Sequence, residues 1–236
     1  ELHDEAPFPL LALTMHTVFQ PDDETEAAKR QTAELGVKSE VFTCDPLALP
    51  EIRNNPPDRC YWCKRKIFQT FLDVCRARRI AHLLDGTNAD DGHVYRPGRR
   101  ALKELGVLSP LASLGFTKQE IRKLSAERGL PTASKPSMPC LATRFEYGAE
   151  LTPERIGQAG KGEAFLRSLL PETADVRLRV QGKNARIEVP PASFELILKN
   201  RAAIAETLHG LGFEFVTLDL EGYRSGCYDK NLTTEV

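Results

Sequence analysis

Cys60 and Cys63 form a C-x-x-C motif, a spacing that suits sulfur or metal chemistry. The residues after it repeat apolar side chains at helical spacing, so the motif lies at the start of a predicted helix, where free N–H groups favour a thiolate. Arg59 and the cations at 64–66 add positive charge. In a cytosolic chain this motif indicates metal, cluster or redox chemistry. The alternatives are an accidental pair and one half of a structural zinc site.

A third cysteine, Cys140, lies in a segment with two prolines, one of them Pro139, and with flanking cations that include Arg144. Because prolines restrict the backbone, this segment is predicted to present its thiol rigidly. Taken alone, Cys140 could also be an ordinary loop cysteine. Together with Cys60 and Cys63, it could bind three irons of a 4Fe-4S cluster and leave the fourth iron open.

The other three cysteines are weaker candidates. Cys75 falls on the apolar stripe of the predicted helix, so we expect it in the core. Cys44 lies beside an aspartate at the end of a predicted strand. Cys227 lies in a glycine-containing tail, and it would be the natural fourth ligand if the metal were zinc.

The segment 85–91 follows an apolar run and contains a glycine, a hydroxyl, an amide and carboxylates. Such groups at a strand end can meet a nucleotide or its magnesium, although ordinary turns use the same residue types. The arginines of 95–100 could bind phosphate or carboxylate, or form a solvated basic face. The residues predicted here for nucleotide binding are Asp85, Gly86, Thr87, Asn88 and Asp90.

A predicted hairpin near the end of the chain carries alternating charges. Arg177 and Arg179 share one strand face, and Arg186 and Glu188 share a face of the return strand. If the two faces coincide, the hairpin is an anion clamp with a neighbouring carboxylate. The alternative is an ordinary exposed antiparallel sheet.

The elements that position these residues alternate between strand and helix in the first half of the chain. This alternation indicates an α/β fold with a parallel sheet, whose ligands gather at the carboxyl ends of the strands. The predicted strands cover 10–14, 37–43 and 80–84, and the predicted helices cover 21–36 and 63–79.

The second half of the chain has a different pattern. A capping box at Thr117 begins a helix that ends at Gly129, a loop covers 131–147, and Thr152 begins another helix. We therefore expect one domain at 1–148 and a smaller α/β domain at 149–236. In the second domain we predict a hairpin of strands 176–180 and 185–189, a long helix at 192–211 and a strand at 213–220.

The chain has 236 residues, a net charge of −1 and 28% charged residues. A balanced charge argues against nonspecific binding of nucleic acid or of an anionic membrane. No apolar run reaches the length of a membrane span, and the first residues lack the pattern of a signal peptide. A cytoplasmic protein is therefore expected.

Five linked motifs resemble those of the LarE family, which are ATP-dependent sulfurtransferases with a PP-loop ATPase domain. The similarity keeps order and spacing over almost the whole chain, and the tail 220–226 fits as well. The motifs are Arg-Cys-Tyr-Trp-Cys-Lys at 59–64, Asp-Gly-Thr-Asn-Ala-Asp-Asp at 85–91, Tyr-Arg-Pro-Gly-Arg-Arg-Ala-Leu at 95–102, Ser-Pro-Leu at 109–111 and Pro-Ser-x-Pro-Cys-Leu-Ala-Thr-Arg at 136–144.

This resemblance implies a Rossmann-like, adenine nucleotide alpha hydrolase-like fold and a defined reaction. The family adenylylates a carboxylate of pyridinium-3,5-biscarboxylic acid mononucleotide, and sulfur then replaces AMP to give a thiocarboxylate for the nickel-pincer cofactor. ATP and magnesium are implied, and so is a homo-oligomer. Some members sacrifice the sulfur of one cysteine, whereas members with three cysteines use a 4Fe-4S cluster supplied by a sulfide donor.

The same resemblance implies roles for individual residues. Cys140 matches the family's sulfur-donating cysteine, and with Cys60 and Cys63 it indicates the cluster-bearing type. Trp62 lies where the family has an aromatic residue near the substrate, and Arg144 lies beside the donor. Arg177 and Arg179 match ligands of the substrate phosphate, while Glu163, Glu188 and Glu195 match acidic residues that bind a metal.

One departure concerns the phosphate loop. The family's Ser-Gly-Gly-x-Asp-Ser motif does not occur, and residues 1–9 match the end of the helix that follows it. Either that loop precedes the residues of this chain or the protein lacks ATPase function; the ATPase pattern that continues to Asp91 favours the former.

Two other functions remain open. A PP-loop tRNA thiolase would share the cluster and the use of ATP, but it should carry a basic surface or zinc ribbons. The other alternative is a metal-binding, nucleotide-sensing module without catalysis.

Overall fold

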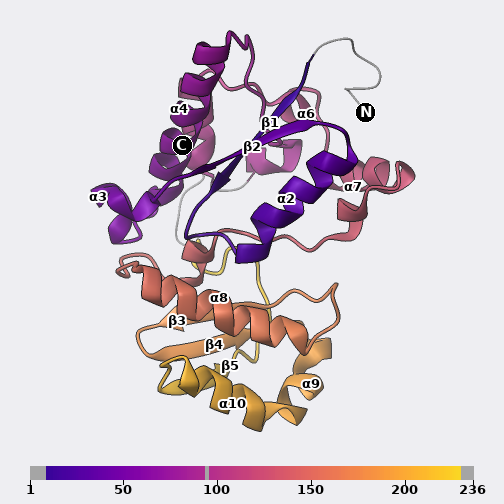
Figure 1. Cartoon of the computed structure of the whole chain (residues 1–236). Coiled ribbons are helices and arrows are strands. Elements are labelled where there is room, and N and C mark those ends of the chain that lie inside the picture. The colour runs from indigo at the N-terminus through magenta and orange to yellow at the C-terminus, as the bar shows by residue number, and fades with distance from the viewer. Residues whose placement is uncertain (1–8, 94–95, 230–236) are drawn as a thin grey trace.

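A computed structural model describes residues 9–93 and 96–229 of the chain, which form two sheets with helices around them (Figure 1). The first sheet pairs β1 with β2, and the second has the order β3-β4-β5. Both sheets are combined with helices, so the α/β class is confirmed. Within the described ranges, no helix is long and apolar enough to cross a membrane.

The first sheet is parallel, as expected for strands joined through a helix. β1 (Leu11–His16) and β2 (Lys38–Thr43) are joined by α2 (Asp22–Glu34). The chain leaves α2 through Gly36, whose φ of 65° is one that glycine adopts without a steric penalty. The two strands and the helix predicted for this region are confirmed.

The strand predicted at 80–84 is wrong. Only Leu84 pairs, in an isolated parallel bridge to Leu108. The bridge is held by two backbone bonds, from Leu108 N to Leu83 O (3.0 Å) and from Asp85 N to Leu108 O (2.9 Å). The apolar character of this run does not reflect deep burial, because Leu84 and Leu108 are exposed. In the described residues the parallel sheet is therefore smaller than predicted.

The helix that carries the C-x-x-C motif is α4 (Arg59–Arg78), which begins four residues earlier than its apolar repeat. It follows the short α3 (Pro50–Arg53), and its C-cap is Arg79, whose backbone is left-handed. The buried side of α4 carries Phe71, which meets the ring of Phe42 in β2 edge to face. Cys75 is buried on this side, as predicted.

Short helices connect α4 to the second sheet. They are α5 (Gly98–Glu104), α6 (Pro110–Ser113) and α7 (Lys118–Glu127), and α7 has the predicted capping box between Thr117 and Glu120. The segment predicted as a loop contains two 3-10 turns, Pro131–Ser134 and Leu141–Arg144. The second turn directly follows Cys140, so it fixes the backbone beside that thiol.

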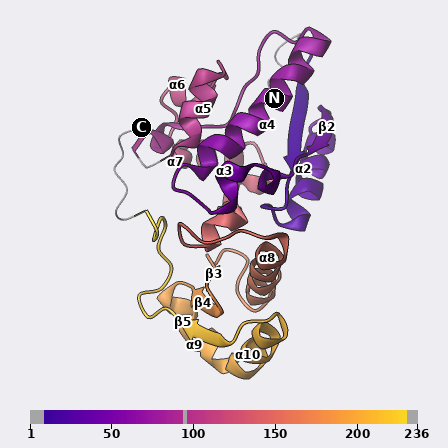
Figure 2. The same cartoon turned by 90° about the vertical axis from the view of Figure 1, so that its left-hand side faces the viewer.

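The second sheet contains the predicted hairpin, with β3 (Arg177–Gln181) antiparallel to β4 (Asn184–Glu188). β5 (Phe215–Leu218) adds in parallel to β4. Figure 2 shows α8 (Pro153–Ser168) and α10 (Arg201–Gly210) beside this sheet. A Cβ atom on Gly162 of α8 would lie 2.4 Å from Leu178 and 2.9 Å from Leu208, so glycine allows these elements to approach closely.

The long helix predicted at 192–211 is wrong in one respect, because it is two helices. α9 (Phe194–Lys199) ends at Asn200, and α10 begins at the next residue. The Asn200 side chain donates a hydrogen bond to the carbonyl of Leu196 (2.8 Å), and its backbone departs from helical geometry (φ −95°, ψ 11°). Asparagine competes with the helix for backbone hydrogen bonds in this way.

The hydrophobic core joins the two halves of the chain. Phe19, Leu47 and Ile52 from the first half belong to the same buried cluster as Leu178 and Leu208. Backbone bonds also cross position 148, since Gly148 N donates to residue 55 (3.2 Å) and Leu151 N donates to residue 53 (2.7 Å). The domain boundary near 148 stays a prediction, and it would coincide with a packed interface.

Candidate active site

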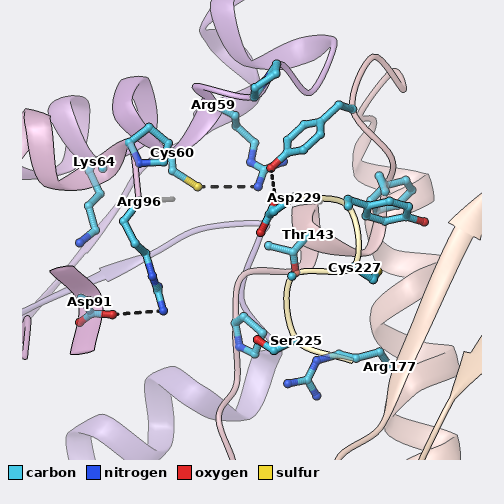
Figure 3. A pocket seen from close by; sticks show the side chains of 18 of the residues that line it. Arg59, Cys60, Lys64, Asp91, Arg96, Thr143, Arg177, Ser225, Cys227 and Asp229 are labelled. Carbon is cyan, nitrogen blue, oxygen red and sulfur yellow. Dashed lines mark hydrogen bonds and ion pairs between the residues drawn. The ribbon is translucent and has the colours of Figure 1, made fainter. Parts of the chain in front are cut away.

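A cavity of about 640 Å³ is the candidate site (Figure 3). Its walls come from the start of α4, the start of α5, the segment after Cys140, the strand β3 and the tail 223–229. At α5, a Cβ atom on Gly98 would lie 2.8 Å from Lys64, so the absence of a side chain lets α5 pack closely on α4. Among the predicted site residues, Cys60, Thr87, Arg177 and Arg179 line the cavity.

Cys60 lies on the cavity wall in the first turn of α4, beside the buried Arg59. The Arg59 guanidinium donates to the Cys60 sulfur at 3.7 Å and to the carbonyl of Ala142 at 3.4 Å. It also donates to the side-chain oxygen of Asn55. One arginine thus contacts both the C-x-x-C helix and the turn after Cys140.

Cys63 and Cys140 pack partly buried against the hydrophobic core. Burial, together with negative charge on Cys140 and Cys60, raises the pKa of Cys63 to about 12. Burial also raises the pKa of Cys140, while the Arg59 charge opposes that shift. These two thiols remain protonated at neutral pH unless a cationic group binds them.

Cys60, Cys63 and Cys140 are free cysteines whose sulfur atoms could serve as ligands of a metal ion or of an iron-sulfur cluster. In the described parts of the chain, no group of three or more His, Cys, Asp or Glu residues is arranged to hold one ion. Cluster ligands bind different irons, so they need not converge on one point. The Cys227 thiol donates instead to Glu188 (3.6 Å), which gives no support to its predicted role as a fourth zinc ligand.

The hairpin brings its charges together on one face. Arg179 lies opposite Arg186, and both bind Glu188, at 2.8 and 3.0 Å. Arg177 is buried separately, donating to the carbonyl of Ser137 (3.0 Å). Glu188 is therefore neutralised by arginines, while the two arginines of β3 reach the cavity wall.

Arg144 and Glu163 form a second buried pair, away from the cavity wall. The guanidinium donates two hydrogen bonds of 2.6 Å to the carboxylate, and both side chains are almost fully buried. Glu163 also accepts from Leu178 N (3.1 Å) and from Arg167 (3.0 Å). The pair ties the turn after Cys140 to α8 and β3. The structure does not bring the predicted metal residues together, since Glu195 is exposed on α9.

The predicted nucleotide residues mostly bond to one another. Asp85 accepts from Thr87 and Ser109, each at 2.5 Å, and Asp90 accepts from the backbone of Lys118 (2.9 Å). Asn88 accepts from the Asp90 backbone (3.0 Å). Thr87 reaches the cavity wall, as does Asp91, which was predicted only as part of the motif.

Beside these residues, Arg96 pairs with Asp91 at 3.1 Å and Lys64 lies 4.0 Å from Asp85. These contacts do not decide whether the basic stretch 95–100 binds an anionic ligand or forms a solvated face. Its first residue, Tyr95, lies outside the described residues.

Trp62 packs against the core and does not line the cavity. Its indole N–H donates to Asp58 at 3.0 Å, and its ring meets that of Tyr61 edge to face. The placement of Trp62 near the substrate therefore stays a prediction.

The tail 223–229 is a part of the site that sequence reasoning noted only as a motif. The Tyr147 hydroxyl donates to Asp229 (2.6 Å), while Arg177 lies over the ring of Tyr223 and Arg179 over that of Tyr228. Aromatic residues spaced along a tail give a weak signal, because their arginine partners are far away in sequence. The tail closes the cavity on the hairpin side (Figure 3).

Asn55 was also missed. It is fully buried with a φ of 46°, and its amide donates to the carbonyls of Phe145 (3.0 Å) and Glu146 (2.7 Å). Its neighbours Asn54 and Pro56 are typical turn residues, so no sequence pattern indicated that Asn55 links the end of α3 to the segment after Cys140.

No protein-family model matches the chain. A protein of Lactiplantibacillus plantarum named pyridinium-3,5-bisthiocarboxylic acid mononucleotide synthase is 37% identical over 222 residues, which cover 94% of this chain and 80% of that protein. This chain belongs to the LarE family.

Two further relatives have no described function. An uncharacterized Synechocystis protein is 39% identical over 89% of this LarE-family chain and 79% of its own length. An uncharacterized Methanocaldococcus jannaschii protein is 31% identical over 76% of the chain and 69% of its own length. Membership of the LarE family therefore rests on similarity over most of the chain.

Proposed function

We propose that this chain is an ATP-dependent sulfurtransferase. It would adenylylate a carboxylate of pyridinium-3,5-biscarboxylic acid mononucleotide and replace AMP with sulfur to form a thiocarboxylate for nickel-pincer cofactor synthesis. The observation that carries the proposal is the identity of 37% over 94% of the chain to the Lactiplantibacillus plantarum synthase. The convergence of Cys60 and the turn after Cys140 on one buried guanidinium supports it.

In this proposal, Cys60, Cys63 and Cys140 hold a 4Fe-4S cluster. The thiols are soft donors, and bound iron would stabilise the thiolate forms of Cys63 and Cys140 against the burial that raises their pKa. A bound cluster would supply a replaceable sulfide from its fourth iron, and a separate sulfide donor would restore it. The protein would then turn over without losing the sulfur of Cys140.

The arginines of the hairpin would hold the anionic substrate. Arg177 and Arg179 line the cavity with guanidinium groups fixed by Tyr223 and Tyr228, a geometry that suits a phosphate. Glu188 keeps Arg179 in place. The cavity is large enough for a mononucleotide, since small-ligand pockets usually measure ~300–1,000 Å³.

ATP and magnesium would bind at the opposite end, where Thr87 and Asp91 reach the cavity. Asp85, Gly86, Asn88 and Asp90 would shape that end. The proposed fold of the first part is the PP-loop ATPase fold. The remaining assignments that we propose from the family are Trp62 and Arg144 near the substrate and a homo-oligomer.

The test is sulfur transfer by protein expressed from its complete reading frame and purified without air. It is incubated with ATP, magnesium, the mononucleotide and sulfide, and thiocarboxylate and AMP are followed by mass spectrometry. We expect several thiocarboxylates per protein and an unchanged mass for Cys140. Cys140→Ala should lose both transfer and cluster, while Cys75→Ala on the same helix as Cys60 should retain them.

Three results would contradict parts of this proposal. Stoichiometric zinc without iron in protein never exposed to air would eliminate the cluster. Loss of the elements of hydrogen sulfide from Cys140 after one turnover would replace the cluster route by sacrifice of this cysteine. The absence of AMP formation with every substrate present would eliminate adenylylation.

A further inference from the structure

Arg59 is a buried cation that lacks a carboxylate partner. Its side chain is 4% exposed, yet within 9–93 and 96–229 no aspartate or glutamate forms an ion pair with it. The other buried arginines differ, because each pairs with a carboxylate: Arg144 with Glu163, Arg179 with Glu188 and Arg177 with Asp175 at 3.7 Å. A buried charge is unfavourable unless an opposite charge offsets its loss of hydration. The position of Arg59 therefore calls for an anion.

The side chain of Asn55 holds Arg59 in place. Both amide hydrogens of Asn55 are used by the carbonyls of Phe145 and Glu146, so its oxygen faces the guanidinium. The left-handed backbone at Asn55 fixes the direction of this side chain. Arg59 is thus preorganised rather than free to follow a ligand.

The remaining donors of Arg59 point at the sulfur-bearing segments. One reaches the Cys60 sulfur (3.7 Å), and another reaches the Ala142 carbonyl two residues after Cys140 (3.4 Å). Figure 3 shows the Cys60 sulfur directed at this guanidinium. Among Asn55, Ala142 and Cys60, which accept these hydrogen bonds, only the Cys60 thiol can ionise.

We propose that Arg59 is the counter-cation of the anionic sulfur group held by Cys60, Cys63 and Cys140. This inference rests on the proposed function, because the three thiolates and their cluster provide the anion. The charge of Arg59 stabilises that anion inside the protein, and its contact with Cys60 fixes where the sulfur lies relative to the cavity. A purely structural Arg59 would instead serve only to bond Asn55 and Ala142.

Reduction potential separates these two roles. Removing a positive charge beside an anionic cluster makes reduction harder, so Arg59→Gln should lower the midpoint potential of the reconstituted cluster. Arg59→Lys keeps the charge, and its potential should stay close to that of the wild-type protein. Arg76→Gln, at an exposed arginine of the same helix, is the matched control and should leave the potential unchanged.

The same variants are assayed for iron, acid-labile sulfide and sulfur transfer. Arg59→Gln should slow transfer by about tenfold to a hundredfold, the range for loss of a hydrogen bond to a charged group. Arg59→Lys should recover most of that loss. If Arg59→Gln does not fold, Arg59→Lys carries the test, because transfer as low as in Cys60→Ala would overturn the charge role.

The possible failures are distinguishable. If wild-type protein binds no iron and sulfide, the proposed cluster is wrong, and so is the anion that this inference requires. If wild-type protein carries the cluster and transfers sulfur while Arg59→Gln has an unchanged potential, only the role of Arg59 is overturned.

Discussion

The charged residues near Cys140 in the fold and those near Asp91 are held in different ways. Near Cys140, arginine charges are buried and bonded from several sides, as in the Arg144–Glu163 pair. Near Asp91, the side chains of Lys64 and Arg96 are 40% and 59% exposed and make single ion pairs. Water can take the place of the carboxylate partners of Lys64 and Arg96, because these cations are exposed. Water cannot take the place of Glu163, because its pair with Arg144 is buried.

This difference separates a rigid end from an adjustable end. Buried, saturated groups fix the position of a reacting sulfur with little reorganisation. Exposed cations can exchange one anionic partner for another as a substrate arrives and a product leaves. The predictions below test that division through stability, from the largest expected effect to the smallest.

The largest effect should come from Arg144→Ala. The change leaves Glu163 charged and buried without its bidentate partner, so we expect a loss of about 3–5 kcal/mol in the free energy of unfolding. Urea unfolding measures it. Arg155→Ala, at a partly exposed arginine of α8 that donates to a backbone carbonyl, should change stability by less than about 1 kcal/mol. Equal losses in the two variants would contradict the comparison.

Asn55→Gly should have an intermediate effect. Glycine accepts the left-handed backbone, so the variant isolates the hydrogen bonds that Asn55 makes to Arg59, Phe145 and Glu146. We expect a loss of about 1–3 kcal/mol from groups left without partners. Asn54→Gly, at the exposed neighbour, is the control for added backbone freedom. If urea unfolding gives the two variants the same free energy of unfolding, the hydrogen bonds of Asn55 do not contribute to stability.

Tyr147→Phe should cost about 1 kcal/mol, because it removes one hydrogen bond to Asp229 while water can reach the carboxylate that remains. The same change should free the tail, which limited proteolysis detects as faster cleavage within 223–229. Cleavage at the wild-type rate would show that the stacking of Tyr223 and Tyr228 on the arginines holds the tail without this bond.

The smallest effect should come from Arg96→Gln. Its ion pair with Asp91 is largely exposed, so we expect less than about 1 kcal/mol, and less again in high salt. Unfolding of this variant and of Arg144→Ala is compared at two salt concentrations. If the loss of stability in Arg96→Gln did not depend on salt, Arg96 would resemble the buried arginines such as Arg144.

Sequence patterns predicted local features better than long-range partners. The C-x-x-C at a helix start, the capping box at Thr117 and the hairpin follow from local spacing, and the structure has them. The strand at 80–84 could not be judged from apolar residues alone, because pairing depends on a distant segment. The break at Asn200 depended on one side-chain bond within an otherwise helical pattern.

The site shows the same limit. Arg144 and Glu163 were each predicted to meet a ligand, but they are 19 residues apart and bind each other. Asn55 joins Arg59 to a segment 90 residues away, and no local pattern marks such a bond. Charge and spacing identified candidate side chains, whereas burial decided which partners they have.

The Arg144–Glu163 pair restricts how this protein can change over generations. Replacing either residue alone leaves a buried charge, whereas replacing both by apolar residues of similar volume is often nearly neutral in other proteins. The first of two successive substitutions would therefore be selected against even where the second would rescue it. Residues 144 and 163 should therefore change together in evolution, and only rarely.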